Sequence, residues 1–333
     1  MISFLVSRNP SLGAYAPSTI DALRAEAGLV SATAISRDEV LAGTASDAEV
    51  VFSSWGMPEF SGVEIEAHLP RLRAVFYAAG TVQAFARPFL ERGIRVCSAW
   101  RENALPVAEF AVSQILLANK GFFQTCGRCR SLEARAESHR IFSAFPGNFD
   151  CRVGLLGCGS IGRLVAEALR KHRLEVLVFD PFLPDSAAEA LGVRKASLEE
   201  IFSTCQTVSN HLANNAQTRG MLGYSLFSRM LPNATFVNTG RGAQVVEADL
   251  VRALEEAPGR SALLDVTWPE PPPAGHPFYG LPNVFLTPHM AGSSGLEIRR
   301  MGEAMLEEFR AWRADPETPT PRCVTIPMLA TMA

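Results

Sequence analysis

The sequence predicts an α/β protein with two doubly wound parallel sheets, and three observations support this. The chain has 333 residues, whereas a typical domain has about 150, so two domains are expected. Short apolar runs alternate with segments of helical spacing, as in parallel strands joined by helical crossovers. A polar, Arg-rich stretch at residues 128–140 interrupts this alternation once and is the best candidate for an exposed connection.

The first series of elements ends near Trp100. Ser36-x-x-Glu39 has the form of a capping box and indicates the start of a helix. The predicted strands of this series are residues 2–6, 50–52, 73–78 and 94–97, and two further predicted helices are 18–27 and 82–92.

A long helix over about residues 104–120 precedes the second series. Ser197-x-x-Glu200 and Ser294-x-x-Glu297 are two further capping signals, and the helix after the second is expected to reach about residue 313. The tail, 315–333, contains four Pro and no helical period, so we expect it to lie along the surface. The predicted strands of this series are 153–156, 175–179, 207–211, 235–238, 262–266 and 284–286.

Composition argues against several classes of protein. Lys and Arg number 31 against 34 Asp and Glu, a net charge of -3 that does not suit a non-specific nucleic-acid binder. No apolar run is long enough to cross a membrane and no secretory leader is evident, so we expect a cytoplasmic protein. Seven scattered Cys indicate reduced thiols, with no metal site expected. Cys126-x-x-Cys129 is either a redox or metal pair or simply two thiols one helical turn apart.

The first functional motif is the run Gly157-Cys158-Gly159-Ser160-Ile161-Gly162, between a predicted strand and a predicted helix. Gly157 permits the tight turn, Gly159 lets a pyrophosphate approach the backbone, and Gly162 allows close packing of helix on strand. The helix N-terminus, with Ser160 and Ile161, offers N–H groups to phosphates. The next strand ends in Asp180, which suits ribose hydroxyls and repels a 2′-phosphate. These features predict a Rossmann domain that prefers NAD (NADH) to NADP.

Three later loops follow predicted strands and each carries a residue suited to catalysis. Arg241 lies in Asn238-Thr239-Gly240-Arg241-Gly242, Glu270 follows the strand that leads to Asp265, and His289 follows the last strand. Ligands of open α/β sheets bind outside the carboxyl ends of the strands. A guanidinium binds a carboxylate through two bonds, and His can donate or accept a proton near neutral pH.

These residues resemble the NAD-dependent D-2-hydroxyacid dehydrogenases, which include glyoxylate/hydroxypyruvate reductases and phosphoglycerate dehydrogenases. The resemblance covers most of the chain after about residue 74 and includes Pro106-Val107-Ala108-Glu109 on the long helix. It implies hydride transfer between NAD(H) and C2 of a 2-hydroxy or 2-oxo acid, D-specific in stereochemistry. Arg241 would hold the substrate carboxylate, His289 would be the acid/base, and Glu270 would orient His289.

The resemblance also implies the organisation of the whole chain. A dinucleotide-binding domain, residues 102–291, would be inserted into a flavodoxin-like substrate domain formed by 1–101 and completed by 292–333, and the protein would be a homodimer. Asp265 would lie near the nicotinamide amide. With the glycine loop and Asp180, the other residues expected to line the cofactor are His211, Thr218, Thr239 and Gly292.

The substrate turn departs from the family pattern. It reads Ala78-Ala79-Gly80-Thr81-Val82-Gln83 and lacks the Asp that usually follows the Gly-rich turn. Ala79 and Gly80 are either backbone ligands of the substrate carboxylate or an ordinary strand-to-helix turn. The identity of the 2-oxo acid therefore stays open. An NAD(H)-sensing interaction protein with little turnover is the alternative function, and a panel of 2-oxo acids would separate the two.

Overall fold

The computed structural model describes residues 1–9 and 12–330 of the chain. They form two compact units: unit 1 comprises Met1–Ala104 and Ser293–Ala333, and unit 2 comprises Leu105–Gly292. Residues 10, 11 and 331–333, which fall within the ranges predicted for the substrate domain, lie outside the described residues.

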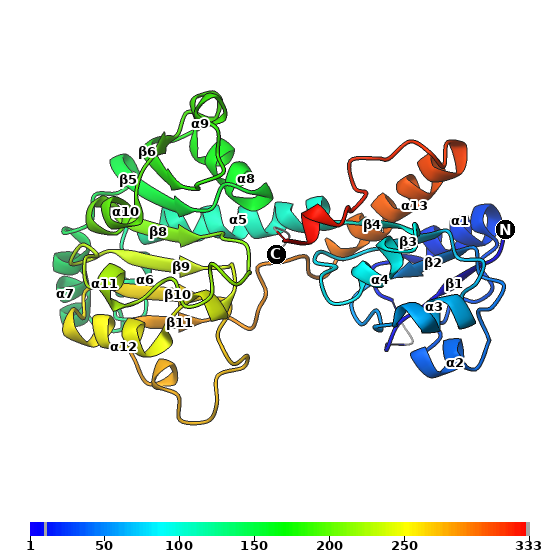
Figure 1. Ribbon diagram of the computed structural model, residues 1–333. Helices are drawn as coiled ribbons and strands as arrows, with labels where there is room; N and C mark the ends of the chain where they lie inside the picture. Colours follow the sequence, from blue (N-terminus) through cyan, green and yellow to red (C-terminus); the bar gives the residue numbers. More distant parts are fainter. Residues whose placement is uncertain (10–11, 331–333) are drawn as a thin grey trace. The chain divides into compact units, whose positions relative to one another are not determined.

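Unit 1 contains a four-stranded parallel sheet in the order β1-β2-β3-β4 (Figure 1). A short segment extends the edge of this sheet, because Leu29 pairs with Ser3 and Ile35 with Val6 in isolated parallel bridges. The four strands are β1 (Ser3–Leu5), β2 (Val50–Ser53), β3 (Ala74–Tyr77) and β4 (Arg95–Ser98).

Helices cover both faces of this sheet. One apolar core lies between the sheet and α2, α3 and α4, and a second lies between the sheet and α1 and α13. The predicted helix start at Ser36 is confirmed, because Ser36 forms a capping box with Glu39 at α2. Ser61 forms a second capping box, with Glu64 at α3, which was not predicted. The helices of unit 1 are α1 (Pro17–Ala27), α2 (Arg37–Leu41), α3 (Gly62–His68), α4 (Ala86–Leu90), α13 (Ile298–Ala314) and the 3₁₀ turn η3 (Pro327–Ala330).

The C-terminal helix α13 completes the core of the N-terminal sheet and lies beside α1 (Figure 1). Phe309 packs against Phe52 and Phe76 with ring centroids 5.7 and 5.9 Å apart. Gly302 allows this close approach, because a Cβ there would collide with the carbonyl oxygen of Ala14. The predicted start of this helix was wrong: α13 begins at Ile298, and Ser294 forms part of a turn in which its N–H donates to Glu297.

Unit 2 contains a seven-stranded parallel sheet in the order β11-β10-β9-β8-β5-β6-β7. With β5 as the first strand, the chain builds outward through β6 and β7 and then returns to β8 on the other side of β5. This is the doubly wound order, and its switch point lies between β5 and β8. The strands are β5 (Phe149–Leu156), β6 (Arg173–Phe179), β7 (Arg194–Lys195), β8 (Thr207–Asn210), β9 (Thr235–Asn238), β10 (Ser261–Leu264) and β11 (Val284–Leu286).

The two faces of the unit 2 sheet are also covered by helices. Residues of α5, α8 and α9 form the core on one face, and α10, α11 and α12 form the core on the other. The helices are α5 (Trp100–Ala118), α6 (Phe122–Thr125), α7 (Leu132–Phe142), α8 (Ser160–Leu169), α9 (Asp185–Leu191), α10 (Leu198–Thr204), α11 (Tyr224–Phe227) and α12 (Glu247–Glu256), with 3₁₀ turns η1 (Gly242–Gln244) and η2 (Pro277–Tyr279).

The α/β fold class and both parallel sheets are confirmed, whereas several short elements were not predicted. The Arg-rich stretch at 128–140 is largely exposed, as predicted, but it contains a helix that was not predicted: α7 occupies most of it, and Ser131 caps this helix by accepting from the N–H of Ala134. The two-residue strand β7 was not predicted. Within the described residues, no helix combines the length and the apolar character needed to cross a membrane.

Candidate active site

The predicted functional residues of unit 2 all follow the carboxyl ends of its strands. The ends of β5 and β6 carry the glycine loop and Asp180, and the end of β8 carries His211. Arg241, Asp265 and His289 follow β9, β10 and β11. Because neighbouring parallel strands end at the same edge of a sheet, the fold gathers these residues along one edge of unit 2.

The glycine loop has the geometry that a dinucleotide requires. Gly157 has a φ of +90°, and a Cβ there would come within 2.7 Å of the His211 carbonyl oxygen. A Cβ at Gly162 would collide with the carbonyl oxygen of Gly157, whereas nothing lies within 4 Å of the position of a Cβ at Gly159. Gly159 is also the N-cap of α8 and no side chain caps this end. The loop is therefore tight where the protein packs on itself and open where a pyrophosphate would approach.

Asp180 is held against this loop at the end of β6. Its Oδ2 accepts from the N–H of Cys158 at 2.7 Å, and its Oδ1 accepts from the N–H of Phe182 at 2.8 Å. The carboxylate is partly exposed. A ribose bound here would meet a negative charge that backbone N–H groups fix in place, so the position fits the predicted contact.

His211 is buried at the switch point of the sheet. Its Nε2 lies 3.0 Å from Ser209 Oγ and its Nδ1 lies 3.5 Å from Thr239 Oγ1. Burial lowers the pKa of His211 to about 4, so the ring is neutral at ordinary pH. Thr218 lies in the turn that follows, where its hydroxyl donates to the Ala213 carbonyl at 2.6 Å. His211 is thus poorly placed to exchange protons with a ligand, which leaves it the predicted lining role.

Arg241 lies in a turn that a buried amide network supports. Its Nη1 donates to the Gly240 carbonyl at 2.7 Å, and its backbone N–H donates to Gln244 Oε1 at 3.2 Å. Gln244 Oε1 also accepts from Asn210 Nδ2 at 2.6 Å, and Asn210 donates to Asn238 at 2.9 Å. Burial lowers the pKa of Arg241, and the negative charge of Glu270 opposes that shift. An arginine pKa lies so high that the guanidinium stays charged, and its burial strengthens its attraction for an anion.

His289 and Glu270 form a direct pair. His289 Nδ1 lies 2.6 Å from Glu270 Oε1, and the side chains are 49% and 38% exposed. Because a carboxylate only accepts, this contact places an imidazole proton on Nδ1 and leaves Nε2 outside the pair. His289 has a φ of +54°, which is uncommon for a residue with a side chain.

Asp265 holds the turn that carries His289. This residue is 3% exposed, and its Oδ1 accepts from Thr287 Oγ1 at 2.6 Å and from the N–H of Met290 at 2.8 Å. Its Oδ2 accepts from the N–H of Ala291 at 2.9 Å, next to the predicted cofactor residue Gly292. Asp265 therefore positions the His289 turn, a role that the sequence did not indicate; its contact with the nicotinamide stays a prediction.

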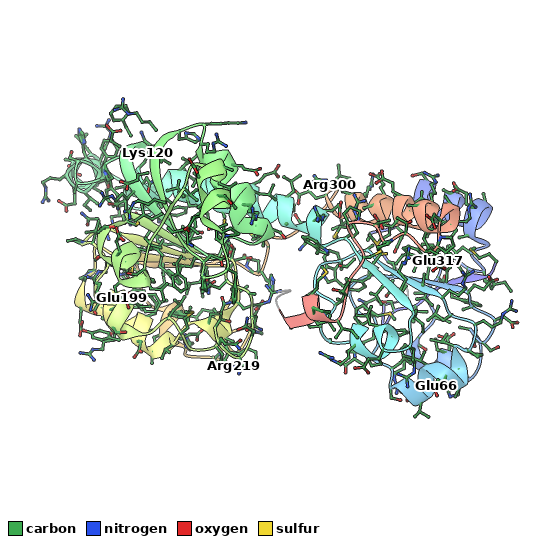
Figure 2. The ribbon with its side chains drawn as sticks, turned by 45° about the horizontal axis from the view of Figure 1, so that its top comes forward. Glu66, Lys120, Glu199, Arg219, Arg300 and Glu317 are labelled. Carbon is green, nitrogen blue, oxygen red and sulfur yellow. The ribbon has the colours of Figure 1, made fainter. Side chains whose placement is uncertain are left out.

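Glu247 is a further supporting residue that the sequence analysis did not single out. Its Oε1 accepts from the N–H of Trp268 at 2.7 Å, and its Oε2 lies 3.3 Å from His276 Nε2. Burial raises the pKa of Glu247. The labelled Arg219 of Figure 2 has its guanidinium 5.5 Å from the centre of the Trp268 ring. These contacts hold the loop that carries Glu270. Little in the sequence indicated these supporting roles. Gln244 lies in a 3₁₀ turn and Glu247 in the first turn of α12, where polar residues are common.

In unit 1, the Ser98 hydroxyl holds the predicted substrate turn through its backbone carbonyl oxygens. Ser98 Oγ, at the end of β4, lies 2.9 Å from the Ala79 carbonyl oxygen and 2.5 Å from the Gly80 carbonyl oxygen, and its one hydroxyl proton is shared between them. Ala79 is fully buried and Gly80 is partly exposed. The turn thus has a defined shape, while its contact with substrate stays a prediction.

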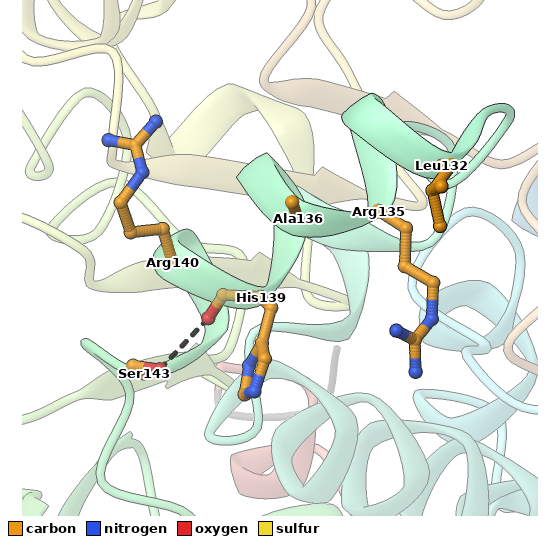
Figure 3. A pocket seen from close by; sticks show the side chains of 6 residues that line it. All are labelled: Leu132, Arg135, Ala136, His139, Arg140 and Ser143. Carbon is orange, nitrogen blue, oxygen red and sulfur yellow. Dashed lines mark hydrogen bonds between the residues drawn. The ribbon is translucent and has the colours of Figure 1, made fainter.

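Two other features lie elsewhere. Cys126 and Cys129 are both exposed at the end of α6. A hollow on α7 is lined by Leu132, Arg135, Ala136, His139, Arg140 and Ser143 (Figure 3). None of these six residues follows a strand of the sheet, so this hollow is separate from the cluster described above.

Comparison with known proteins identifies the family. Residues 115–291 match the family described as "D-isomer specific 2-hydroxyacid dehydrogenase, NAD binding domain". The match spans more than half of the chain, and the chain belongs to this family.

Individual relatives agree with this assignment. The D-3-phosphoglycerate dehydrogenase of Mycobacterium bovis is 29% identical over 300 residues, which cover 89% of this chain and 54% of that protein. The chain thus spans about half the length of that relative. The glyoxylate reductase of Korarchaeum cryptofilum is 29% identical over 251 residues, which cover 75% of this chain and 76% of that protein.

A solved structure shows the same fold. An acyclic imino acid reductase in complex with NADPH and D-Arg aligns with a TM-score of 0.74 and 22% identity, covering 97% of this chain and 100% of that one.

Proposed function

We propose that the protein is an NAD-dependent dehydrogenase that interconverts 2-oxo acids and D-2-hydroxy acids. The observation that carries this proposal is the His289–Glu270 pair, with a 2.6 Å contact through Nδ1, at the same sheet edge as the glycine loop and Arg241. The membership of the chain in a dehydrogenase family supports it.

In the proposed reaction, each residue meets a different part of the substrate. Arg241 binds the carboxylate of the 2-oxo acid, and its positive charge stabilises the negative charge that develops on the carbonyl oxygen. His289 donates a proton from Nε2 to that oxygen, and Glu270 holds the ring and balances its charge. Bound NADH would supply the hydride. In the reverse direction, His289 accepts the proton of the hydroxyl.

The cofactor would lie along the glycine loop, with its ribose hydroxyls at Asp180 and its pyrophosphate at Gly159 and the N-terminus of α8. His211, Thr218, Thr239, Asp265 and Gly292 are the other proposed lining residues. We propose that NAD(H) is preferred to NADP(H), because Asp180 would repel a 2′-phosphate. The imino acid reductase of similar fold holds NADPH, so this preference depends on the residues of this chain.

Substrate selection is proposed to involve the backbone of Ala79 and Gly80 in addition to Arg241. The two relatives act, by their names, on phosphoglycerate and glyoxylate. We therefore propose a small 2-oxo acid as substrate. We also propose a homodimer as the active form, on the resemblance to the family alone.

The test is a panel of 2-oxo acids assayed with NADH and with NADPH, followed by the loss of reduced cofactor. We expect turnover with at least one acid, faster with NADH, and oxidation of only the D enantiomer in the reverse direction. Asp180→Ala should narrow the difference between the cofactors. If NADH binds and no member of the panel is reduced, an NAD(H)-sensing protein is the better description.

A further inference from the structure

Two cysteines that are far apart in the sequence meet at the edge of the unit 1 sheet. Cys97 lies in β4 and Cys323 lies in the segment after α13, and the two form an isolated antiparallel bridge. Their sulfur atoms are 3.4 Å apart. Cys97 is buried and Cys323 is partly exposed, whereas the two cysteines of the C-x-x-C motif are both fully at the surface.

We propose that Cys97 and Cys323 form an oxidation-sensitive dithiol that peroxide converts into a disulfide, joining the C-terminal segment covalently to β4. Nothing in the proposed dehydrogenase reaction uses either thiol, so this modification site is independent of that reaction.

The backbone geometry suits a disulfide. The N–H of Ser98 donates to the Arg322 carbonyl at 3.1 Å, and the N–H of Val324 donates to the Val96 carbonyl at 2.8 Å. These flanking bonds make Cys97 and Cys323 a non-hydrogen-bonded antiparallel pair, in which the Cα atoms are typically about 4.5 Å apart. That separation lies within the range for disulfides. The sulfurs need to approach by about 1.4 Å, from 3.4 Å to about 2.0 Å.

The surroundings make the two thiols unequal. The hydrogen bond with Cys97 is the main cause that lowers the pKa of Cys323 to about 6, and Thr320 adds two contacts to Cys323 Sγ, each 3.3 Å long. Arg95 favours the thiolate as well, while burial opposes it. The same hydrogen bond and burial raise the pKa of Cys97, and the charge of Glu308 acts in the same direction.

This asymmetry assigns a role to each cysteine. A partly exposed thiolate beside a second thiol is the arrangement of a peroxide-sensitive pair. The Cys323 thiolate attacks hydrogen peroxide, which breaks the O–O bond and gives a sulfenic acid and hydroxide. The Cys97 thiol, losing its proton, then attacks the Cys323 sulfur and expels water. In total, two thiols and one peroxide become one disulfide and two waters, so the cysteines are oxidised by two electrons and the peroxide is reduced.

A metal site is the competing interpretation, because one Glu308 oxygen lies within 4.8 Å of both sulfurs. However, Glu308 already has partners: its Oε1 accepts from Arg322 Nη1 at 3.0 Å, and its Oε2 accepts from Thr320 Oγ1. Arg322 also donates to Glu102 at 2.6 Å. The carboxylate is thus neutralised by an arginine, which favours a thiol pair over a cation site.

The test uses the full chain with Cys126→Ser and Cys129→Ser, so that the exposed motif does not react. After treatment with peroxide, peptide mapping should find Cys97 linked to Cys323, and dithiothreitol should reverse the link. The thermal unfolding temperature of the oxidised chain should rise, because the disulfide closes a long loop. Cys97→Ser, whose hydroxyl can still donate to Cys323, should leave Cys323 as a sulfenic acid that dimedone traps, and Cys323→Ser should give neither product.

Other outcomes would overturn the proposal. One is a chain in which Cys97 and Cys323 stay reduced after treatment with peroxide, or are oxidised no faster than the buried Cys205, a matched control thiol. Another is one zinc ion bound per chain that protects both cysteines and is lost in Cys323→Ser. Since the readouts are linkage and stability, failure of the proposed dehydrogenase activity would not affect them.

Discussion

Replacement of Asp265 by Asn tests how His289, the proposed proton donor, is positioned. The carboxylate accepts hydrogen bonds from Thr287, Met290 and Ala291, and the residue is 3% exposed. Two of these donors meet Oδ1 and one meets Oδ2, so whichever way the amide of Asn turns, its NH₂ group faces at least one backbone N–H. A hydrogen bond to a charged group contributes about 1.5–3 kcal/mol, and a buried unpaired donor costs about 1–3 kcal/mol.

We therefore expect the free energy of unfolding of Asp265→Asn to fall by about 3 kcal/mol, with its urea dependence unchanged. We also expect kcat for reduction of the 2-oxo acid to fall about 100-fold, because a displacement of about 1 Å in a catalytic group has that effect. Both oxygens of Asp265 are occupied by the His289 turn, so the Kd for NADH should change less than kcat.

The assay combines urea unfolding, steady-state kinetics and titration with NADH. Asp185→Asn is the matched control, since it changes the same functional group at a surface position beside Lys195 and should leave all three quantities unchanged. Unaltered stability and kcat in Asp265→Asn would refute the reasoning. A large rise in the Kd for NADH with little change in kcat would instead assign Asp265 to the nicotinamide.

Three further predictions concern the other site residues. His289→Ala should lower kcat at least about 100-fold with little change in the Kd for NADH; retained activity would place the proton donor elsewhere. Arg241→Lys should raise KM about tenfold, since a charged hydrogen bond of about 1.5 kcal/mol is lost, whereas Glu270→Gln should lower kcat at nearly constant KM; the reverse pattern would exchange their roles. Because the folded chain holds the pKa of His211 at about 4, below 6.5, its neutral form is favoured and stability should fall as pH drops from 6.5 to 4, by about 3 kcal/mol. His211→Asn should remove this part of the dependence, as urea unfolding at several pH values would show.

Much of the fold could be predicted because most of its strands contain short apolar runs, and several of them are buried along their whole length. The strands at 235–238 and 284–286 have the predicted bounds. The two-residue strand β7 has no such pattern, because both its residues are exposed Arg and Lys. The helix α7 escaped prediction for a related reason: its Arg-rich sequence has little apolar periodicity, and capping by Ser131 and the contacts of α6 define it instead.

The candidate site likewise contains residues that the sequence predicts and residues that it does not. Glycines in a fixed spacing and charged residues after strands are visible in the sequence, because each is tied to a local feature of the chain. Gln244 and Glu247 are not visible, since their roles arise only when the turn after β9 meets the loops after β8 and β10. A Cβ at Gly242 would collide with the backbone of Thr267, which shows how closely these segments approach. That proximity results from the order of the strands in the sheet, and no local sequence pattern predicts it.

These contacts also explain how a half-exposed pair keeps a defined geometry. A side-chain pair that is 49% and 38% exposed contributes little to stability by itself, because water competes for its polar groups. The left-handed backbone of His289 adds a cost of about 1 kcal/mol. The three hydrogen bonds to the buried Asp265 offset that cost and fix the backbone of the turn from which the His289 side chain extends. Glu247 holds the loop from which Glu270 reaches His289 Nδ1. The position of His289, the proposed proton donor, therefore depends on the carboxylates of Asp265 and Glu247 rather than on the exposed pair, and a search for catalytic residues by exposed charge alone would miss these supporting groups.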